Sequence, residues 1–334
     1  MEQNIQFRLD HLTKPQGSLG LLEEYILKLG RIQMTDKPQV AKKRIIVFAG
    51  DHGITEEGVS AFPSAVTQQM VLNFANGGAA INVLARKYNI DLAVADVGVN
   101  GDFDKALPIL HLKIAKGTKN LLKEDAMNEE QVNAALKVGK ELVIKAKSDG
   151  IQLLGIGEMG IGNTTSASAI TAALLQKPVE EITGRGTGIN DAQLKHKIEV
   201  IQQALKNRDI DSAKPQDLLR KIGGFEIAAI VGVALGCVEQ RLALVIDGFI
   251  ATAAVAIAAA IDAQVRDVVF ASHKSQEKGH RYLLVYLQLK AFLELEMRLG
   301  EGSGAAIAMD ILDTATALYN QMATFESASV SNKT

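Results

Sequence analysis

The sequence has a single cysteine, Cys237, no tryptophan and few aromatic residues among its 334 positions. One cysteine excludes an internal disulfide and a zinc cluster built from cysteine ligands. Hydrophobic residues make up 47% of the chain and aromatic residues only 4%, so Ala, Leu, Ile and Val must fill the core. A chain of this length forms one large domain or two modest ones.

A strong charge of one sign and a long apolar segment are also missing. The formal net charge is −2, which gives no electrostatic reason to expect nucleic acid or an anionic membrane as a partner. The longest apolar run, Phe249 to Ile261, is too short to cross a bilayer. The first residues lack the basic and then apolar pattern of a signal peptide. These absences predict a soluble, cytoplasmic protein with neither nucleic acid nor membrane as a partner.

Short apolar runs that end in or next to glycine predict β-strands, and helical patterns lie between them. The predicted strands are 44–50, 91–98, 152–157 and 242–248, and the predicted helices are 64–88, 128–147, 164–175, 191–205 and 225–235. Strands buried on both faces that alternate with helices predict an α/β fold, with a parallel Rossmann-like sheet flanked by helices. Ligands bind beyond the carboxyl ends of the strands in such sheets.

The two ends of the chain carry longer helical patterns. They cover residues 18–33, 279–299 and 304–322. We therefore expect a small helical subdomain built from residues 1–35 and 280–330, beside an α/β sheet domain, residues 36–279, that carries the phosphate loops. The tail, 327–334, has a composition that predicts disorder.

The stretch RLGEGSGAA, residues 298–306, places Glu301 inside a run of glycines between two helical patterns. Glycines let a backbone turn sharply and come close to a ligand. A carboxylate held in such a loop is a candidate general base aimed at a substrate proton. The alternative is a turn between two helices with a solvated glutamate.

A second glycine-rich loop, GIGEMGIGNTT at 155–165, follows a predicted strand and opens a helix. Its first six residues match the dinucleotide fingerprint, which suggests a nicotinamide-dependent oxidoreductase as an alternative function. Glu158 inside the loop would repel a pyrophosphate, and no strand follows to carry the usual acidic residue. One phosphate near the amides of Gly160, Asn163 and Thr164 is favoured instead.

A third loop, TGRGTGIND at 183–191, also opens a helix, and Lys197 follows in that helix. Main-chain amides at Gly186 together with one lysine suit a phosphate monoester. The alternative is a flexible loop with surface lysines.

Acidic and histidine residues form no metal-binding pattern in the sequence. Asp51 and His52 have no further ligand at a helical spacing, so a hydrogen-bonded pair that shapes the pocket is favoured over a metal site. Enzymes that use phosphoribosyl pyrophosphate place two adjacent acids at a strand end, whereas only Asp247 stands here. We expect no metal and no cofactor.

Taken together, these loops resemble one family, the nicotinate-nucleotide–dimethylbenzimidazole phosphoribosyltransferases of cobalamin lower-ligand assembly. The matching segments keep their order and span nearly the whole chain: LTKPQGSLGLLEE (12–24), AGDHGITEEGVS (49–60), GIGEMGIGNTT (155–165), KIGGFEIAAIVG (221–232), VIDGFIATAA (245–254), SHKSQEKG (272–279) and MRLGEGSGAAIAM (297–309).

The resemblance implies that the 5-phosphoribosyl group of nicotinate mononucleotide passes to a lower-ligand base, 5,6-dimethylbenzimidazole, with inversion. The products would be α-ribazole 5′-phosphate and nicotinate. It implies that Glu301 is the catalytic base, that Glu158 is a second carboxylate near the ribose, and that Lys197 binds the phosphate with Gly160 and Gly186. It also implies a homodimer.

Three positions depart from the family pattern. Phe62, Met70 and Met159 stand in the implied base pocket, where members that act on dimethylbenzimidazole often have a small polar residue, Gln and Leu. These changes indicate either neutral repacking or an acceptor range that extends to phenols such as p-cresol, which lack a second ring nitrogen. An NAD-dependent oxidoreductase and a non-catalytic nucleotide-binding paralogue remain as alternatives.

Overall fold

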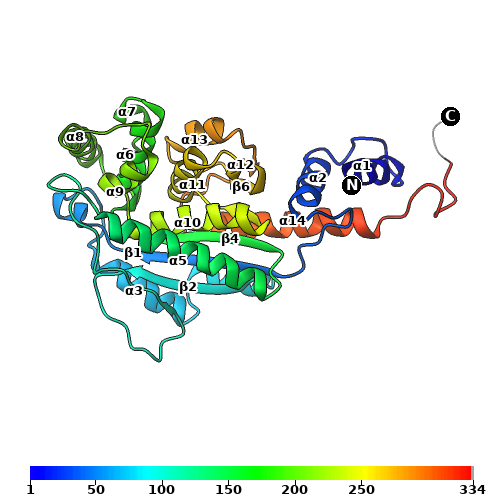
Figure 1. Ribbon diagram of the computed structural model, residues 1–334, viewed down its shortest axis with the longest axis horizontal. Coiled ribbons are helices and arrows are strands. Elements are labelled where there is room, and N and C mark those ends of the chain that lie inside the picture. Colours follow the sequence, from blue (N-terminus) through cyan, green and yellow to red (C-terminus); the bar gives the residue numbers. More distant parts are fainter. Residues whose placement is uncertain (332–334) are drawn as a thin grey trace.

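The computed structural model describes residues 1–331 (Figure 1). Within these residues a single parallel sheet of seven strands has the order β3-β2-β1-β4-β5-β6-β7. The strands are β1 (Lys43–Gly50), β2 (Asp91–Gly98), β3 (Leu110–His111), β4 (Leu153–Met159), β5 (Ala243–Ile246), β6 (Val269–His273) and β7 (Ala291–Leu293). The prediction of a parallel, Rossmann-like α/β fold is confirmed.

Helices connect the strands and cover both faces of the sheet. They are α1 (Glu2–His11), α2 (Leu21–Gln33), η1 (Gly53–Glu57), α3 (Ala65–Ala75), α4 (Ala80–Lys87), α5 (Glu129–Ser148), α6 (Asn163–Leu175), α7 (Val179–Ile182), α8 (Asp191–Asn207), α9 (Pro215–Ile222), α10 (Phe225–Gln240), α11 (Phe249–Ile261), α12 (Val265–Val268), α13 (His280–Leu287) and α14 (Ser303–Gln321). None of the helices in the described residues is long and apolar enough to cross a membrane.

The core lies between the sheet and these helices. The inner strand β1 is buried along nearly its whole length and pairs with β2 and β4. Helices α5 and α10 lie in front of the sheet in Figure 1 and pack closely on each other. A Cβ at Gly139 would lie 2.0 Å from the carbonyl oxygen of Ala229, so glycine is needed where these two helices cross.

Two of the predicted helices are wrong in extent. The pattern at 64–88 forms two helices, α3 and α4, because Gly77 adopts φ +78° and turns the chain between them. The pattern at 279–299 forms only α13, after which β7 adds to the edge of the sheet and a loop continues to residue 302. The apolar residues of β7 fit the spacing of a helix, but they are partly buried residues of an edge strand. A short apolar pattern does not distinguish a helix from a strand.

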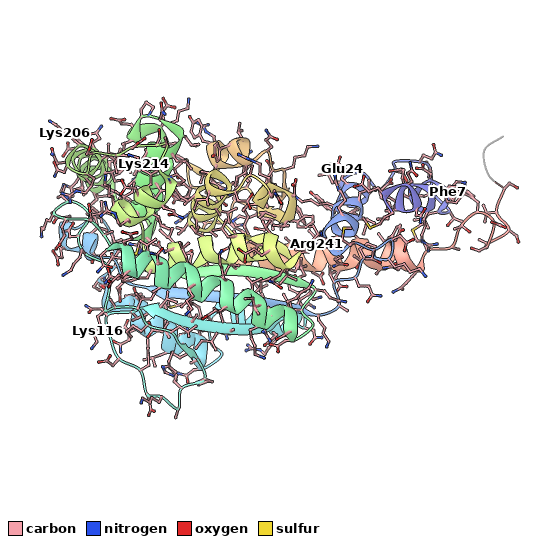
Figure 2. The ribbon with its side chains drawn as sticks, viewed as in Figure 1. Phe7, Glu24, Lys116, Lys206, Lys214 and Arg241 are labelled. Atoms are coloured by element: carbon pink, nitrogen blue, oxygen red, sulfur yellow. The ribbon has the colours of Figure 1, made fainter. Side chains whose placement is uncertain are left out.

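The chain ends form a smaller helical part that extends from the sheet (Figure 1). Figure 2 places Phe7 and Glu24 on this part, away from Lys206 and Lys214. Helices α1, α2 and the end of α14 share a second small core, which includes Ile5 and Tyr319. The side chain of Arg8 donates to the carbonyl oxygen of Tyr319 at 2.9 Å and so caps the end of α14.

Residues 280–293 lie with the sheet rather than with this helical part. Helix α13 packs on α11, and β7 pairs with β6. The division of the chain into two domains stays a prediction. Of the tail predicted to be disordered, 332–334 lie outside the described residues, whereas Ser327 is hydrogen-bonded to Thr324.

Candidate active site

A cavity of about 460 Å³ opens at the carboxyl edge of the sheet. Its walls come from the start of α3, the loop after β4, the loop before α8, the segments after β5 and β6, and the loop before α14. Nine of the ten predicted site residues line it: Phe62, Met70, Glu158, Met159, Gly160, Asn163, Thr164, Gly186 and Glu301. The tenth, Lys197, lies behind the wall and donates to the Thr164 hydroxyl at 2.8 Å.

The loop that carries Glu301 has an unusual backbone. Gly300, Glu301 and Gly302 all have positive φ angles, of 85°, 64° and 85°. Such a conformation is strained for a residue with a Cβ, and it persists only when the surroundings hold it. Asp247, at the end of β5, accepts the main-chain N–H groups of Gly302 at 3.0 Å and Gly304 at 2.8 Å. The loop is thereby tied to the sheet.

The Glu301 side chain is buried against the first turn of α4. The N–H of Ile81 points at Glu301 Oε2 over 3.4 Å, and the residue is 6% exposed. Burial, aided by the nearby Asp247, raises the pKa of the Glu301 carboxyl, while the Ile81 amide opposes the shift. A carboxylate with a raised pKa is a stronger base, which is the property that proton abstraction requires.

Glu158 is a second buried carboxyl group in the same cavity. Asn163 donates to its Oε2 atom. Burial, with a smaller contribution from Asp247, raises the pKa of Glu158 to about 8. The other oxygen, Oε1, lies beside Gly300: a Cβ atom at Gly300 would be 2.5 Å from it. At neutral pH Glu158 is therefore largely a neutral acid, able to donate a proton in a hydrogen bond, next to the ionisable Glu301.

The proposed phosphate end contains a buried lysine with unused donors. Lys197 is 1% exposed, and its ammonium group donates to Thr164. Within residues 1–331 it forms no ion pair within 4.0 Å. Burial lowers the pKa of Lys197 to about 8, so it is still mostly charged at pH 7. A buried cation with free N–H donors favours the binding of an anion.

The two glycines predicted to bind phosphate have further constraints. A Cβ at Gly160 would lie 2.3 Å from the carbonyl oxygen of Gly50, across the gap between β1 and β4 where the strand order reverses. Gly186 has φ +51°, and a Cβ there would lie 2.8 Å from the Thr164 hydroxyl. Both positions therefore need glycine to pack against neighbouring protein atoms.

The prediction that Asp51 and His52 form a hydrogen-bonded pair is wrong, because each side chain has its own partners. Asp51 accepts from the Ser64 hydroxyl at 2.7 Å, whereas His52 Nε2 lies 2.5 Å from a carboxylate oxygen of Glu226. In the described part of the chain, no group of three His, Cys, Asp or Glu side chains is arranged to hold a metal. The Asp51 and His52 side chains support the loops around the cavity.

The match to the dinucleotide fingerprint has a packing explanation. A Cβ at Gly155 would lie 3.2 Å from the Met309 side chain of α14, and a Cβ at Gly157 would lie 2.4 Å from the backbone of Glu301. These two glycines admit α14 and its preceding loop against β4. They face protein atoms, so they give no support to a bound pyrophosphate.

Sequence reasoning missed two residues of this site. The sequence shows Asp247 only as a single acid at a strand end, although it holds the Glu301 loop. The sequence gives Glu277 no role, yet it lines the cavity and accepts the N–H of Gly186 at 2.9 Å. The available signal was the polar segment SHKSQEKG, which begins in the last two residues of β6, a strand that is not among those predicted from the sequence.

Comparison with known proteins places the chain in a family. A family model described as phosphoribosyltransferase matches residues 1–330. The nicotinate-nucleotide–dimethylbenzimidazole phosphoribosyltransferase of Geotalea uraniireducens is 50% identical over 330 residues, which cover 99% of this chain and 94% of that protein. The enzyme of the same name from Chlorobium chlorochromatii is 50% identical over 337 residues, covering 100% and 94%.

Solved structures agree with the sequence relatives. The crystal structure of CobT from Thermus thermophilus superposes with a TM-score of 0.95 at 42% identity, over 99% of both chains. A second crystal structure from the same organism, named as the phosphoribosyltransferase, has a TM-score of 0.93 at 42% identity and covers 99% of this chain and 98% of its own. The chain belongs to the nicotinate-nucleotide–dimethylbenzimidazole phosphoribosyltransferase family.

Proposed function

We propose that this protein transfers the 5-phosphoribosyl group of nicotinate mononucleotide to 5,6-dimethylbenzimidazole, giving α-ribazole 5′-phosphate and nicotinate in cobalamin assembly. The proposal depends on the presence of two groups at one cavity. The Glu301 carboxylate lies in the cavity wall, and the buried ammonium group of Lys197 lies directly behind Thr164, another residue of the wall. The relatives at 50% identity carry the name of this reaction.

The proposed step is a displacement at the anomeric carbon of the ribose. A ring nitrogen of the base attacks this carbon and forms the new bond. The bond to the pyridinium nitrogen breaks, and its electron pair leaves with nicotinate. Inversion from the β to the α configuration follows from attack opposite the leaving group. Glu301 accepts the proton that the attacking azole gives up.

The other polar groups have distinct roles in this proposal. Lys197 and the amides of Gly160 and Gly186 bind the 5′-phosphate, with Asn163 and Thr164 orienting the loop. Glu158, neutral at pH 7, donates a hydrogen bond to the sugar. The pyridine ring of nicotinate becomes neutral when it leaves, which makes it a good leaving group. The reaction then requires a base and a phosphate site that hold one sugar in position.

The acceptor base would lie against Phe62, Met70 and Met159, which line the cavity together. Their apolar side chains favour a second candidate within the same reaction, the transfer to a phenol such as p-cresol. A phenol attacks through its oxygen and leaves no ring nitrogen without a partner in an apolar pocket.

Incubation of the purified protein with nicotinate mononucleotide and either dimethylbenzimidazole or p-cresol tests both candidates. We expect nicotinate and an α-linked ribotide to appear in equal amounts, with chromatography to identify the ribotide and NMR to assign its anomeric configuration. Nucleotide binding without nicotinate release, for either acceptor, would contradict the proposal and favour a non-catalytic paralogue.

We also propose that the protein is a homodimer. Phe62 and Leu299 line the cavity, yet they are 50% and 56% exposed, and apolar side chains at the mouth of a site suit cover by a second copy. Sedimentation at micromolar concentration tests this; a monomer that turns over normally would contradict it. The cytoplasmic location stays a prediction.

A further inference from the structure

The Glu277 carboxylate lies in the loop after β6 and forms part of the cavity wall. The residue is 8% exposed. Its Oε1 atom accepts the main-chain N–H of Gly186 at 2.9 Å, whereas Oε2 is buried and has no hydrogen-bond partner among the described residues. A buried carboxylate oxygen without a partner is costly, so its position calls for an explanation.

The carboxylate rests directly on the glycine loop before α8. A Cβ at Gly184 would lie 2.0 Å from Glu277 Oε2, and Gly186 contributes the N–H that points at Oε1. Phosphate groups bind glycine loops in the same manner, with their oxygens on main-chain N–H groups. The loop thus already holds an anion that belongs to the chain.

The Glu277 carboxylate also affects the pKa of Lys197. Burial lowers the pKa of the Lys197 ammonium, and Glu277 is the charge that opposes this shift. The two groups form no ion pair within 4.0 Å in residues 1–331, so their attraction acts over a longer range. Glu277 helps to keep the buried lysine charged while leaving the other ammonium protons free for a ligand.

We propose that Glu277 is a resident anion, which occupies the Gly184–Gly186 loop in the free protein and which the 5′-phosphate of the donor displaces from Gly186. The proposal rests on the proposed function, because it uses the assignment of the phosphate to Lys197 and Gly186. Two anions that need the same N–H group repel each other and cannot share it. The phosphate then replaces Glu277 as the counterion of Lys197.

Calorimetric titration with inorganic phosphate tests the proposal in the variant Glu277→Gln, which keeps the shape and removes the charge. The titration is done at pH 6.5, below the pKa of Lys197 of about 8. We expect phosphate to bind at least about tenfold more tightly than to the unchanged protein. Glu296→Gln, which removes an exposed carboxylate elsewhere on the same side of the molecule, is the control and should shift the affinity much less.

Unchanged or weaker phosphate binding by a folded Glu277→Gln protein would overturn the proposal, since Glu277 would then support the loop. A crystal of the unaltered protein soaked in inorganic phosphate gives a second test that needs no variant. We expect phosphate on Lys197 and the Glu277 carboxylate moved off Gly186; phosphate bound beside an unmoved Glu277 would contradict the displacement. Neither test depends on turnover, so displacement without nicotinate release would refute only the proposed function.

Discussion

Asp247 accepts the main-chain N–H of Gly304 at 2.8 Å and so joins the end of β5 to the first turn of α14. The same carboxylate accepts the N–H of Gly302 at 3.0 Å. A helix N-terminus carries free N–H groups and a partial positive charge, and a carboxylate satisfies both. The lone acid at the strand end thus positions Glu301, which lies one residue before Gly302.

Replacing Asp247 by Asn should loosen this loop. One of the two carboxylate oxygens becomes an NH₂ group, which cannot accept from a main-chain N–H. The unfolding free energy should fall by about 1–3 kcal/mol, as for a buried donor left without its partner, and turnover should fall with it. Denaturant unfolding and a turnover assay measure the two effects; unchanged values for both would contradict the role of Asp247.

Replacing Glu301 by Gln keeps the side-chain shape and removes its basicity. Turnover with dimethylbenzimidazole should fall by about 100-fold or more, in line with the loss of a general base, while the melting temperature changes little. Glu296→Gln is the matched control, because Glu296 lies exposed in the same connection before α14 and also has a positive φ. Near-normal turnover by Glu301→Gln at neutral pH would remove Glu301 from this role.

Glu158 should make the free protein less stable as the pH rises. Its pKa is about 8 in the folded chain against 4.5 for the ordinary carboxyl, so the folded state holds a proton that the unfolded state has lost. The stabilisation is complete below pH 4.5 and disappears as the pH passes 8, with a slope of at most about 1.4 kcal/mol per pH unit.

Urea unfolding at pH 5.5 and 7.5 measures this effect. The unaltered protein should lose more stability between the two values than Glu158→Gln, which has no titrating group at this position. Asp247, with a pKa raised by burial to about 7, adds a slope of the same sign to both proteins. Equal losses in the two proteins would show that Glu158 is ionised in the folded state.

Replacing Lys197 by Met keeps most of the side-chain volume and removes the buried charge. Binding of nicotinate mononucleotide should weaken by about 1.5–3 kcal/mol, the range for a charged hydrogen bond. Binding of the nucleoside without phosphate should change little. Lys195→Met is the control, since Lys195 lies exposed on the same helix next to Glu199. A protein that binds nucleoside and nucleotide equally well before any change would mean that the phosphate site lies elsewhere.

The double change Phe62→Ser and Met70→Gln should shift the preference between acceptors. It adds polar groups to the cavity wall, each worth about 0.5–1.5 kcal/mol when it forms a hydrogen bond. The ratio of kcat/KM for dimethylbenzimidazole over p-cresol should rise about tenfold. Competition assays with both acceptors measure the ratio directly.

Leu72→Gln is the control for the acceptor preference. It adds an amide to an exposed position of the same helix, and Leu72 is not among the residues of the cavity wall. If the double variant leaves the ratio unchanged, or if the unaltered protein never uses a phenol, Phe62 and Met70 serve packing alone.

The sequence by itself determined the fold class and most of the cavity wall. Apolar runs that end at glycine identified β1, β2, β4 and β5, because a parallel sheet buried on both faces needs continuous apolar strands. The glycine loops after them marked the ligand edge, because the carboxyl ends of parallel strands lie together. The predicted site residues line one cavity or bond to its wall for this reason.

Only the tertiary structure decided which groups meet across that cavity. The placement of β6 brings Glu277 to Gly186, and the end of β5 brings Asp247 to Gly304. These pairs join segments that are far apart in sequence, so local patterns do not encode them. The shifted pKa values of Glu158 and Lys197 arise from burial, which depends on every element packed around them. Residue types alone indicated that carboxyl groups and a lysine lie in the glycine loops and the helix after them, while packing determined the direction in which their pKa values shift.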